Sequence, residues 1–222
     1  MTIAYDGRPY IGWATQPVGN TVQDLLEKAI SEVAKENIRI HGSGRTDTGV
    51  HALGQVAHFD VPGGLAMNAY NWMPAVNNKL PPTVRVMDCE EVPADFHARF
   101  SAKQKTYTYD LCLAPVLPPL SAGLAWHLPR QLDPVSLQKA LDMMRGQHAF
   151  RAFAAKRGNE TADTSYVRTL SRSDLVTTAD GYRITFTGNG FLYKMARLLT
   201  GAAVYAAQGR LRLDDLETLL DQ

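Results

Sequence analysis

Apolar residues recur every three or four positions between residues 21 and 36. The residues on this stripe are Val22, Leu25, Leu26, Ala29, Ile30, Val33 and Ala34. Such spacing places apolar side chains on one face of an α-helix, so a helix is predicted over 21–36. Asn20 or Thr21 can cap its first turn, and Asp24 lies beside the positive end of the helix dipole.

Shorter runs rich in β-branched and aromatic residues predict strands. The predicted single strands cover residues 2–5, 38–40, 55–61, 84–92 and 105–113. Residues 167–178 and 182–187 are predicted to form a hairpin, because the turn signal Asp180-Gly181 lies between them.

Four further helices are predicted. They cover residues 65–72, ending before Pro74, then 134–144, 191–208 and 213–220. The second begins at Asp133-Pro134, which supplies a cap and a first-turn proline, and it stops at Gly146. Strands and helices are mixed in both halves of the chain, which favours an α+β fold with largely antiparallel sheets over a doubly wound one. The proline-rich stretch 115–119 is the best candidate for a linker.

Composition narrows the class of protein further. The chain has 222 residues, of which 45% are hydrophobic and 20% charged, as in ordinary globular proteins. Only two cysteines occur, neither in a CxxC motif, so a disulfide framework and a cysteine zinc site are excluded. No signal peptide is recognisable in residues 1–7, and no apolar run approaches the ~20 residues that span a bilayer. We therefore expect a soluble protein of the cytoplasm.

Basic residues are concentrated in the second half. The net charge is only +1, but residues 130–212 carry 13 Lys and Arg against 6 Asp and Glu. Within residues 145–172 the basic residues are Arg145, Arg151, Lys156, Arg157, Arg168 and Arg172. Such a local excess can attract a polyanion such as RNA, although an ordinary solvated surface explains it equally well.

Three glycines between His41 and His51 predict a loop whose backbone approaches another group closely. Gly44-x4-Gly49 has the spacing of a P-loop, but Val50-His51 replaces the required Lys-Ser/Thr. Gly42-x-Gly44 begins a dinucleotide fingerprint, but Asp47 occupies the third glycine position and would repel a pyrophosphate. Asp47, His51 and His58 lack the spacing of known metal motifs, which argues against a metal site.

Asp47 itself has two interpretations. An aspartate in such a loop commonly hydrogen-bonds its own turn. Alternatively it is a catalytic carboxylate, kept ionised by the neighbouring Arg45 and able to attack an electrophile.

Several motifs occur in an order that resembles the tRNA pseudouridine synthase A (TruA) family. The motifs are Tyr5-Asp6-Gly7 with Tyr10-x-Gly12-Trp13, Thr21-Val22-Gln23 with Leu26-Glu27, the loop Gly44-Arg45-Thr46-Asp47-Thr48-Gly49-Val50-His51-Ala52 with Gly54-Gln55-Val56 and His58-Phe59, Phe96-His97-Ala98-Arg99-Phe100, Lys105-Thr106-Tyr107, and Asn189-Gly190-Phe191-Leu192-Tyr193-Lys194-Met195-Ala196-Arg197. The resemblance covers nearly the whole chain. It implies the pseudouridine synthase fold, with two similar α/β halves meeting around a central cleft. The sequence departs from the family's pattern in two places: its first strand is shorter than the family's, and beyond Gln222 the resemblance leads us to expect a further segment with a closing strand.

The resemblance implies an isomerase that converts uridine to pseudouridine in the tRNA anticodon stem-loop, at positions 38–40. It implies a homodimer that needs neither cofactor nor metal. Residues 1–103 would carry the aspartate loop, and residues 104–222 the tyrosine strand, the basic surface and the arginine helix.

The same resemblance implies roles for individual residues. Asp47 would be the nucleophile, attacking C1′ of the ribose or C6 of the base. Tyr107 would stack on the flipped uracil, and Arg197 would form an ion pair with Asp47. Arg45 would position the RNA backbone, and His51 would contribute to substrate binding.

Other interpretations of these residues stay open at this point. Arg197 is the only charged residue between Met195 and Gly209, so it is either buried and paired or an arginine that reaches the surface. Tyr107 and Tyr109 share one strand face and could simply be core aromatics. The protein as a whole could be a catalytically impaired RNA-binding homologue, or a hydrolase that uses Asp47 and His51 as acid and base.

Overall fold

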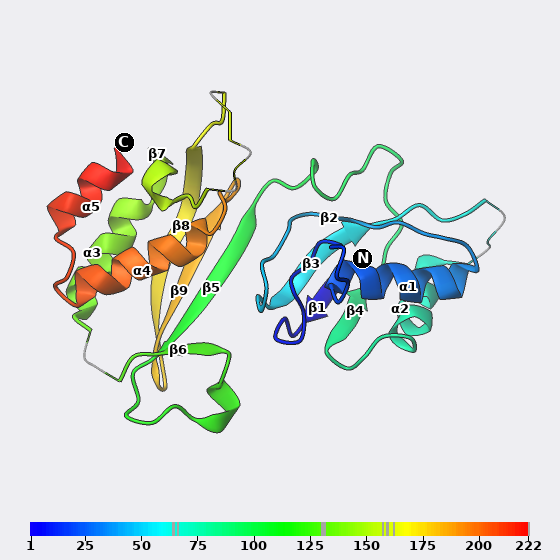
Figure 1. Ribbon diagram of the computed structural model, residues 1–222, viewed down its shortest axis with the longest axis horizontal. Helices are drawn as coiled ribbons and strands as arrows, with labels where there is room; N and C mark the ends of the chain where they lie inside the picture. The colour runs from blue at the N-terminus through cyan, green and yellow to red at the C-terminus, as the bar shows by residue number, and fades with distance from the viewer. Residues whose placement is uncertain are drawn as a thin grey trace. The chain divides into compact units, whose positions relative to one another are not determined.

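The computed structural model describes residues 1–63, 65, 67–129, 132–156, 158, 160–161 and 163–221. The chain divides into two compact units, Met1–Ala102 and Lys103–Gln222 (Figure 1). Each has its own sheet and its own apolar core. Helices and mainly antiparallel strands alternate irregularly, which confirms the predicted α+β class. The expected cleft between the halves and the functional assignment of each half stay predictions.

The first unit contains a four-stranded sheet in the order β2-β3-β1-β4. Its strands are β1 (Thr2–Tyr5), β2 (His41–Gly42), β3 (Ala52–His58) and β4 (Val84–Asp88), and all neighbouring pairs are antiparallel. Helices α1 (Val22–Ala34) and α2 (Ala69–Asn77) pack on one face. The buried face of the sheet presents Ile3, Tyr5, Ala57, Val84 and Val86 to these helices.

Helix α1 forms as its sequence predicts. Of the two candidate caps, Thr21 is the one used, because its hydroxyl accepts a hydrogen bond from the backbone N–H of Asp24 at 3.1 Å. Val22, Leu26 and Ile30 are fully buried in the core of the first unit. The helix ends at Lys35, which adopts a left-handed conformation.

The second unit contains a five-stranded sheet in the order β6-β5-β9-β8-β7. Its elements are β5 (Lys105–Cys112), η1 (Pro119–Ser121), β6 (Ala125–His127), α3 (Pro134–Met144), β7 (Gly146–Ala149), η2 (Phe150–Phe153), β8 (Val167–Thr178), β9 (Gly181–Gly188), α4 (Met195–Ala207) and α5 (Leu213–Leu220). Among the described strands of this sheet, only β5 and β6 pair in parallel. Helices α3, α4 and α5 share one core with the sheet (Figure 1).

The strand predicted over 38–40 is wrong. Ile38 and Ile40 are buried, but side chains of α1 take the hydrogen bonds that a strand would make with a neighbour. The N–H of Ile38 donates to Ser31 Oγ at 2.9 Å, and the N–H of Ile40 donates to Glu27 Oε1 at 3.1 Å. The strand that does form lies directly after this segment, at His41–Gly42.

The helix predicted over 65–72 is displaced. Helix α2 begins only after Asn68, whose Oδ1 accepts from the N–H of Asn71, and it continues through Pro74. Pro74 is exposed, so the Tyr70 carbonyl that loses its helical donor can bond to water instead. Ala66, in the predicted range, lies outside the described residues.

Three other elements differ from their predicted bounds by three residues or more. Strand β3 covers Ala52–His58 rather than 55–61, because it pairs with the whole of β1. Strand β4 ends at Asp88 because its partner β1 is only four residues long. Helix α4 starts four residues later than predicted. Lys194 has a φ of 58°, and the carbonyl of Tyr193 accepts from the N–H of Ala155, so the chain is not helical there.

Candidate active site

Asp47 lies in the loop that connects β2 with β3 in the first unit. The residue is half-buried. Among the described residues its carboxylate forms no hydrogen bond and no ion pair. Arg45 is exposed and forms no ion pair with it, and the roles of Asp47 and Arg45 stay predictions. The carboxylate is thus not used by its own turn and is available to another group.

The N-terminal segment fixes the backbone on one side of this loop. The N–H of Trp13 donates to the Thr46 carbonyl at 3.0 Å, and the N–H of Gly49 donates to the Tyr10 carbonyl at 3.3 Å. The hydroxyls of Tyr5 and Thr46 are 2.8 Å apart and share a hydrogen bond. These contacts hold the residues on both sides of Asp47.

Two glycines allow the segments to come this close. A Cβ atom at Gly7 would lie 2.0 Å from the Val50 carbonyl oxygen, and one at Gly12 would lie 2.6 Å from that of Thr46. Gly12 also has a φ of 110°, which side chains other than glycine rarely allow. The motif Tyr5-Asp6-Gly7 and the motif Tyr10-x-Gly12-Trp13 therefore support the aspartate loop.

Strand β3 fixes the other side. The N–H of Ser43 donates to the Val56 carbonyl at 2.7 Å. Gln55 binds the loop through both ends of its amide, accepting from Ser43 Oγ at 2.7 Å and donating to the Gly44 carbonyl at 2.6 Å. The entry to the loop is thereby held on the sheet.

His51 contacts the same N-terminal segment. Its Nδ1 lies 3.3 Å from the backbone N of Gly7 and 3.2 Å from Asp6 Oδ1. Asp6 also binds the guanidinium of Arg8, and this hydrogen bond lowers the pKa of the Asp6 carboxyl to about 2. The Nδ1 of His51 thus helps to hold the loop against the N-terminal segment.

The second unit brings together the other two motifs. Tyr107 lies on β5, directly opposite Phe186 of β9, on the face that packs on the helices. Its ring meets the edge of Phe191, with ring centroids 4.7 Å apart and planes at 69°. Phe191 belongs to the segment that leads into α4, where Arg197 lies in the first turn. Tyr107 and the arginine motif are therefore adjacent within one unit.

Arg197 is exposed on α4, so of the two interpretations left open for it, the arginine that reaches the surface is the one that applies. The buried side of α4 is formed by residues such as Leu199, Ala203 and Val204, and Arg197 lies at the edge of this side, seven residues before Val204. Its predicted ion pair with Asp47 joins residues of different units and stays a prediction. Of the basic residues of the second unit, Arg145, Arg151, Lys156 and Arg172 are exposed, and Arg157 lies outside the described residues.

Two structural features are absent from the described part of the chain. No cluster of three or more His, Cys, Asp or Glu side chains there is arranged to hold a metal ion. No helix there has both the length and the apolar character needed to cross a membrane.

The model of one protein family, described as tRNA pseudouridine synthase, matches residues 1–101 and 140–222. These ranges include the aspartate loop and the arginine helix. The chain belongs to the tRNA pseudouridine synthase family. It is accordingly an isomerase that makes pseudouridine in tRNA.

Relatives named tRNA pseudouridine synthase A support this assignment over the full length. That of Akkermansia muciniphila is 51% identical, with an alignment that covers 100% of this chain and 84% of the relative. That of Listeria innocua is 41% identical, covering 98% and 87%. A protein of Clostridium perfringens named tRNA pseudouridine synthase A 2 is 38% identical, covering 100% and 88%.

Sequence reasoning missed the support of this pseudouridine synthase's aspartate loop. Roles were predicted only for charged, aromatic or titratable residues, whereas Gly7, Gly12 and Gln55, although part of the quoted motifs, act by close approach and by backbone hydrogen bonds. The signal that could have found them was the pair of glycine-aromatic motifs near the N-terminus. Phe191 was part of a quoted motif, but its contact with Tyr107 depends on the fold of the second unit.

Proposed function

We propose that this protein isomerises uridine to pseudouridine at positions 38–40 of the tRNA anticodon stem-loop, with Asp47 as the nucleophile. The observation that supports this most directly is the Asp47 carboxylate. It has no partner among the described residues, although the backbone around it is held on both sides. A side chain that is unpaired while its loop is fixed suits attack on a bound substrate better than it suits a purely structural turn.

The reaction needs only the substrate and a carboxylate. The Asp47 oxygen bonds to C1′ of the ribose or to C6 of the base, and the bond between N1 and C1′ breaks. The uracil then turns, C5 bonds to C1′, the C5 proton is transferred to N1, and the carboxylate is released. Product and substrate have the same atoms, so no cofactor and no metal is consumed.

Tyr107 and Arg197 are the proposed partners of Asp47. The target base must leave the stem, at a cost of a few kcal/mol. Stacking on an aromatic ring returns about 1–3 kcal/mol per base. Tyr107, supported by Phe191, would provide this ring. Arg197 is exposed at the start of α4 and would pair with the Asp47 carboxylate.

Arg45 and His51 complete the proposed site. Arg45 is exposed beside the nucleophile, where its guanidinium can bind RNA phosphate. His51 would contact the substrate while its Nδ1 faces Gly7 and Asp6. We further propose a homodimer that acts on tRNA in the cytoplasm.

Replacing Asp47 by Asn tests the nucleophile. The protein is incubated with unmodified tRNA, and pseudouridine is mapped by chemical labelling. We expect pseudouridine at positions 38–40 with the wild-type protein, and tRNA binding without product for Asp47→Asn. Asp95→Asn, at an exposed aspartate of the same unit, is the matched control and should stay active. Undiminished turnover by Asp47→Asn would exclude the proposed mechanism.

The same assay separates the alternatives. A catalytically impaired RNA-binding homologue would give a salt-dependent tRNA complex and no product, even with the wild-type chain. A hydrolase would release uracil or cleave the RNA, which changes the mass of the product.

A further inference from the structure

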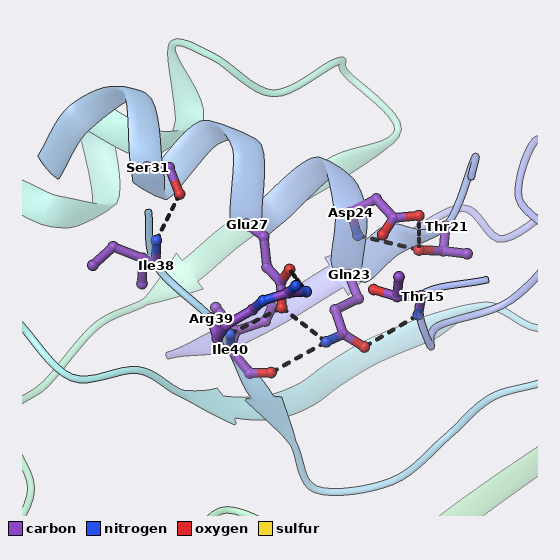
Figure 2. A network of polar contacts seen from close by, with 9 residues as sticks. All are labelled: Thr15, Thr21, Gln23, Asp24, Glu27, Ser31, Ile38, Arg39 and Ile40. Carbon is purple, nitrogen blue, oxygen red and sulfur yellow. Dashed lines mark hydrogen bonds and ion pairs between the residues drawn. The ribbon is translucent and has the colours of Figure 1, made fainter. Parts of the chain in front are cut away.

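Two polar side chains of α1, Gln23 and Glu27, lie between the chain segments that lead to and support the aspartate loop. Figure 2 shows them pointing from the helix toward Thr15 on one side and toward Arg39 and Ile40 on the other. They are one helical turn apart, and Gln23 Nε2 donates to Glu27 Oε1 at 2.9 Å.

Glu27 binds the segment before β2. The residue is only 9% exposed, which is unusual for a glutamate. Its Oε1 accepts from the backbone N–H of Ile40 at 3.1 Å, and its Oε2 accepts from Arg39 Nη1 at 3.0 Å. Because a buried carboxylate must be well hydrogen-bonded, these donors fix both the side chain and the backbone of Ile40.

Gln23 connects this segment with the N-terminal one. Its Nε2 donates to the Ile40 carbonyl at 3.3 Å, and its Oε1 accepts from the N–H of Thr15 at 3.2 Å. Its backbone N–H donates to the Trp13 carbonyl at 3.0 Å. A single residue thus binds both flanks.

Both flanks lead directly to the loop. Trp13 donates its own N–H to the Thr46 carbonyl, one residue before Asp47. Ile40 immediately precedes β2, whose end is the start of the loop. A displacement of either flank would therefore move Asp47 relative to its substrate.

We propose that Gln23 and Glu27 are positioning residues of the isomerisation, which hold the Asp47 loop in its reactive geometry through the backbones of Ile40, Thr15 and Trp13. This inference rests on the proposed role of Asp47. The essential contact of Glu27 is the one with the Ile40 N–H. The ion pair with Arg39 is secondary, because the Arg39 side chain is 68% exposed and can turn to water.

The test separates the backbone contact from the ion pair. Glu27→Ala removes both, Glu27→Gln keeps an oxygen that can accept from Ile40, and Arg39→Ala removes only the ion pair. Glu32→Ala is the matched control on the same helix, because its carboxylate is 44% exposed and pairs only with Lys79 among the described residues. For each variant, kcat, the Kd for tRNA and the unfolding temperature are measured, with kcat taken where the protein is fully folded.

We expect kcat of Glu27→Ala to fall by about ten- to a hundredfold, since small misplacements of reacting groups have effects of this size. The Kd for tRNA should change less than twofold. Glu27→Gln, Arg39→Ala and Glu32→Ala should keep kcat within about threefold of the wild type. A kcat of folded Glu27→Ala equal to that of the wild type would overturn the proposal, as would a loss that Glu27→Gln does not restore.

If Glu27→Ala does not fold, Gln23→Ala tests the same positioning role. It removes the links to Thr15 and Ile40 but leaves the buried carboxylate paired with Arg39 and with the Ile40 N–H. A lowered kcat at unchanged Kd supports the proposal, and an unchanged kcat overturns it. Asp47→Asn, assayed in parallel, distinguishes the two failures: an active Asp47→Asn excludes the nucleophile itself, whereas an inactive one with active Gln23→Ala excludes only the positioning role.

Discussion

The carbonyl oxygen of Thr46 would lie only 2.6 Å from a Cβ atom at Gly12. Because Gly12 has no side chain, the N-terminal segment can pack directly against Thr46, the residue that precedes Asp47. The N–H of Trp13 then reaches the same carbonyl at 3.0 Å. The backbone of the proposed nucleophile is thus supported by a segment far away in the sequence, and this support depends on a missing side chain.

Gly12→Ala should weaken both the fold and the reaction. The new Cβ would meet the Thr46 oxygen, and a φ of 110° is strained for alanine. We expect the unfolding free energy to fall by about 1–3 kcal/mol, the usual cost of such strain. We expect kcat to fall as well, because Thr46 must move. Denaturant unfolding and single-turnover kinetics measure the two effects.

Gly63→Ala is the control for this substitution. A Cβ atom at Gly63 would meet nothing within 4 Å among the described residues, and the position is exposed. This variant should keep the stability and kcat of the wild type. Equal behaviour of the two variants would show that the Gly12 contact has no importance for the loop.

Phe191→Leu should reduce activity through Tyr107. The edge contact between the two rings, with centroids 4.7 Å apart, is lost when leucine replaces the phenyl ring. Aromatic pairs contribute about 0.5–1.5 kcal/mol, which corresponds to a loss of roughly two- to tenfold in kcat if the contact holds Tyr107 in place.

A double-mutant cycle checks that this effect passes through Tyr107. Phe191→Leu is combined with Tyr107→Leu, and in parallel with Tyr109→Leu. The losses in kcat should be less than additive for the pair with Tyr107 and additive for the pair with Tyr109. Additive losses in both pairs would show that Phe191 does not act through Tyr107.

Local sequence signals were sufficient where one element decides its own structure. Helix α1 follows from its apolar stripe and from the Thr21 cap, and the hairpin of β8 and β9 follows from Asp180-Gly181. The same rules failed for Ile38 and Ile40, whose apolar alternation is real but whose backbone binds Ser31 and Glu27 of α1. Tertiary contacts of this kind leave no periodic pattern in the sequence.

In the candidate site, too, features decided by local sequence could be predicted, and features decided by tertiary contacts could not. Asp47 could be selected from the sequence because a carboxylate among glycines is chemically unusual. The exposure of Arg197 could not be predicted, because one arginine on an apolar helix fits either side of it. The support by Gln55 and Gly12 was also missed, because it depends on which strands are neighbours in the sheet.

Gly201→Ala should stabilise the second unit. Gly201 lies within α4, and a Cβ atom there would meet nothing within 4 Å among the described residues. Alanine favours a helix interior over glycine by about 1 kcal/mol, so the unfolding free energy should rise by up to that amount. Ala202→Gly, at the next position, should lower it by a similar amount. A Gly201→Ala variant less stable than the wild type would reveal a close neighbour on this face of α4.

Acid should destabilise the first unit through His58. Burial lowers the pKa of His58, and the nearby imidazoles of His97 and His41 lower it further, whereas Asp60 opposes the shift. The Nδ1 of His58 accepts from the N–H of Ala98 at 3.2 Å, and this requires an unprotonated Nδ1. The unfolded chain, with a histidine pKa near 6.5, therefore takes up the proton first. The stabilisation is complete above pH 6.5 and is lost as the pH falls from there toward the lowered pKa of the folded state.

His58→Asn tests this pH dependence, because asparagine can still accept from Ala98 but does not titrate in this range. The unfolding free energy, measured by denaturant between pH 7.5 and pH 5, should fall less steeply for His58→Asn than for the wild type. His148→Gln removes a histidine of the second unit and should keep the wild-type slope. If His58→Asn loses stability with acid as steeply as the wild type, the proton is taken up by another group. The next side chains to replace are then His41 and His97, whose ring centroids lie 5.1 and 4.7 Å from that of His58.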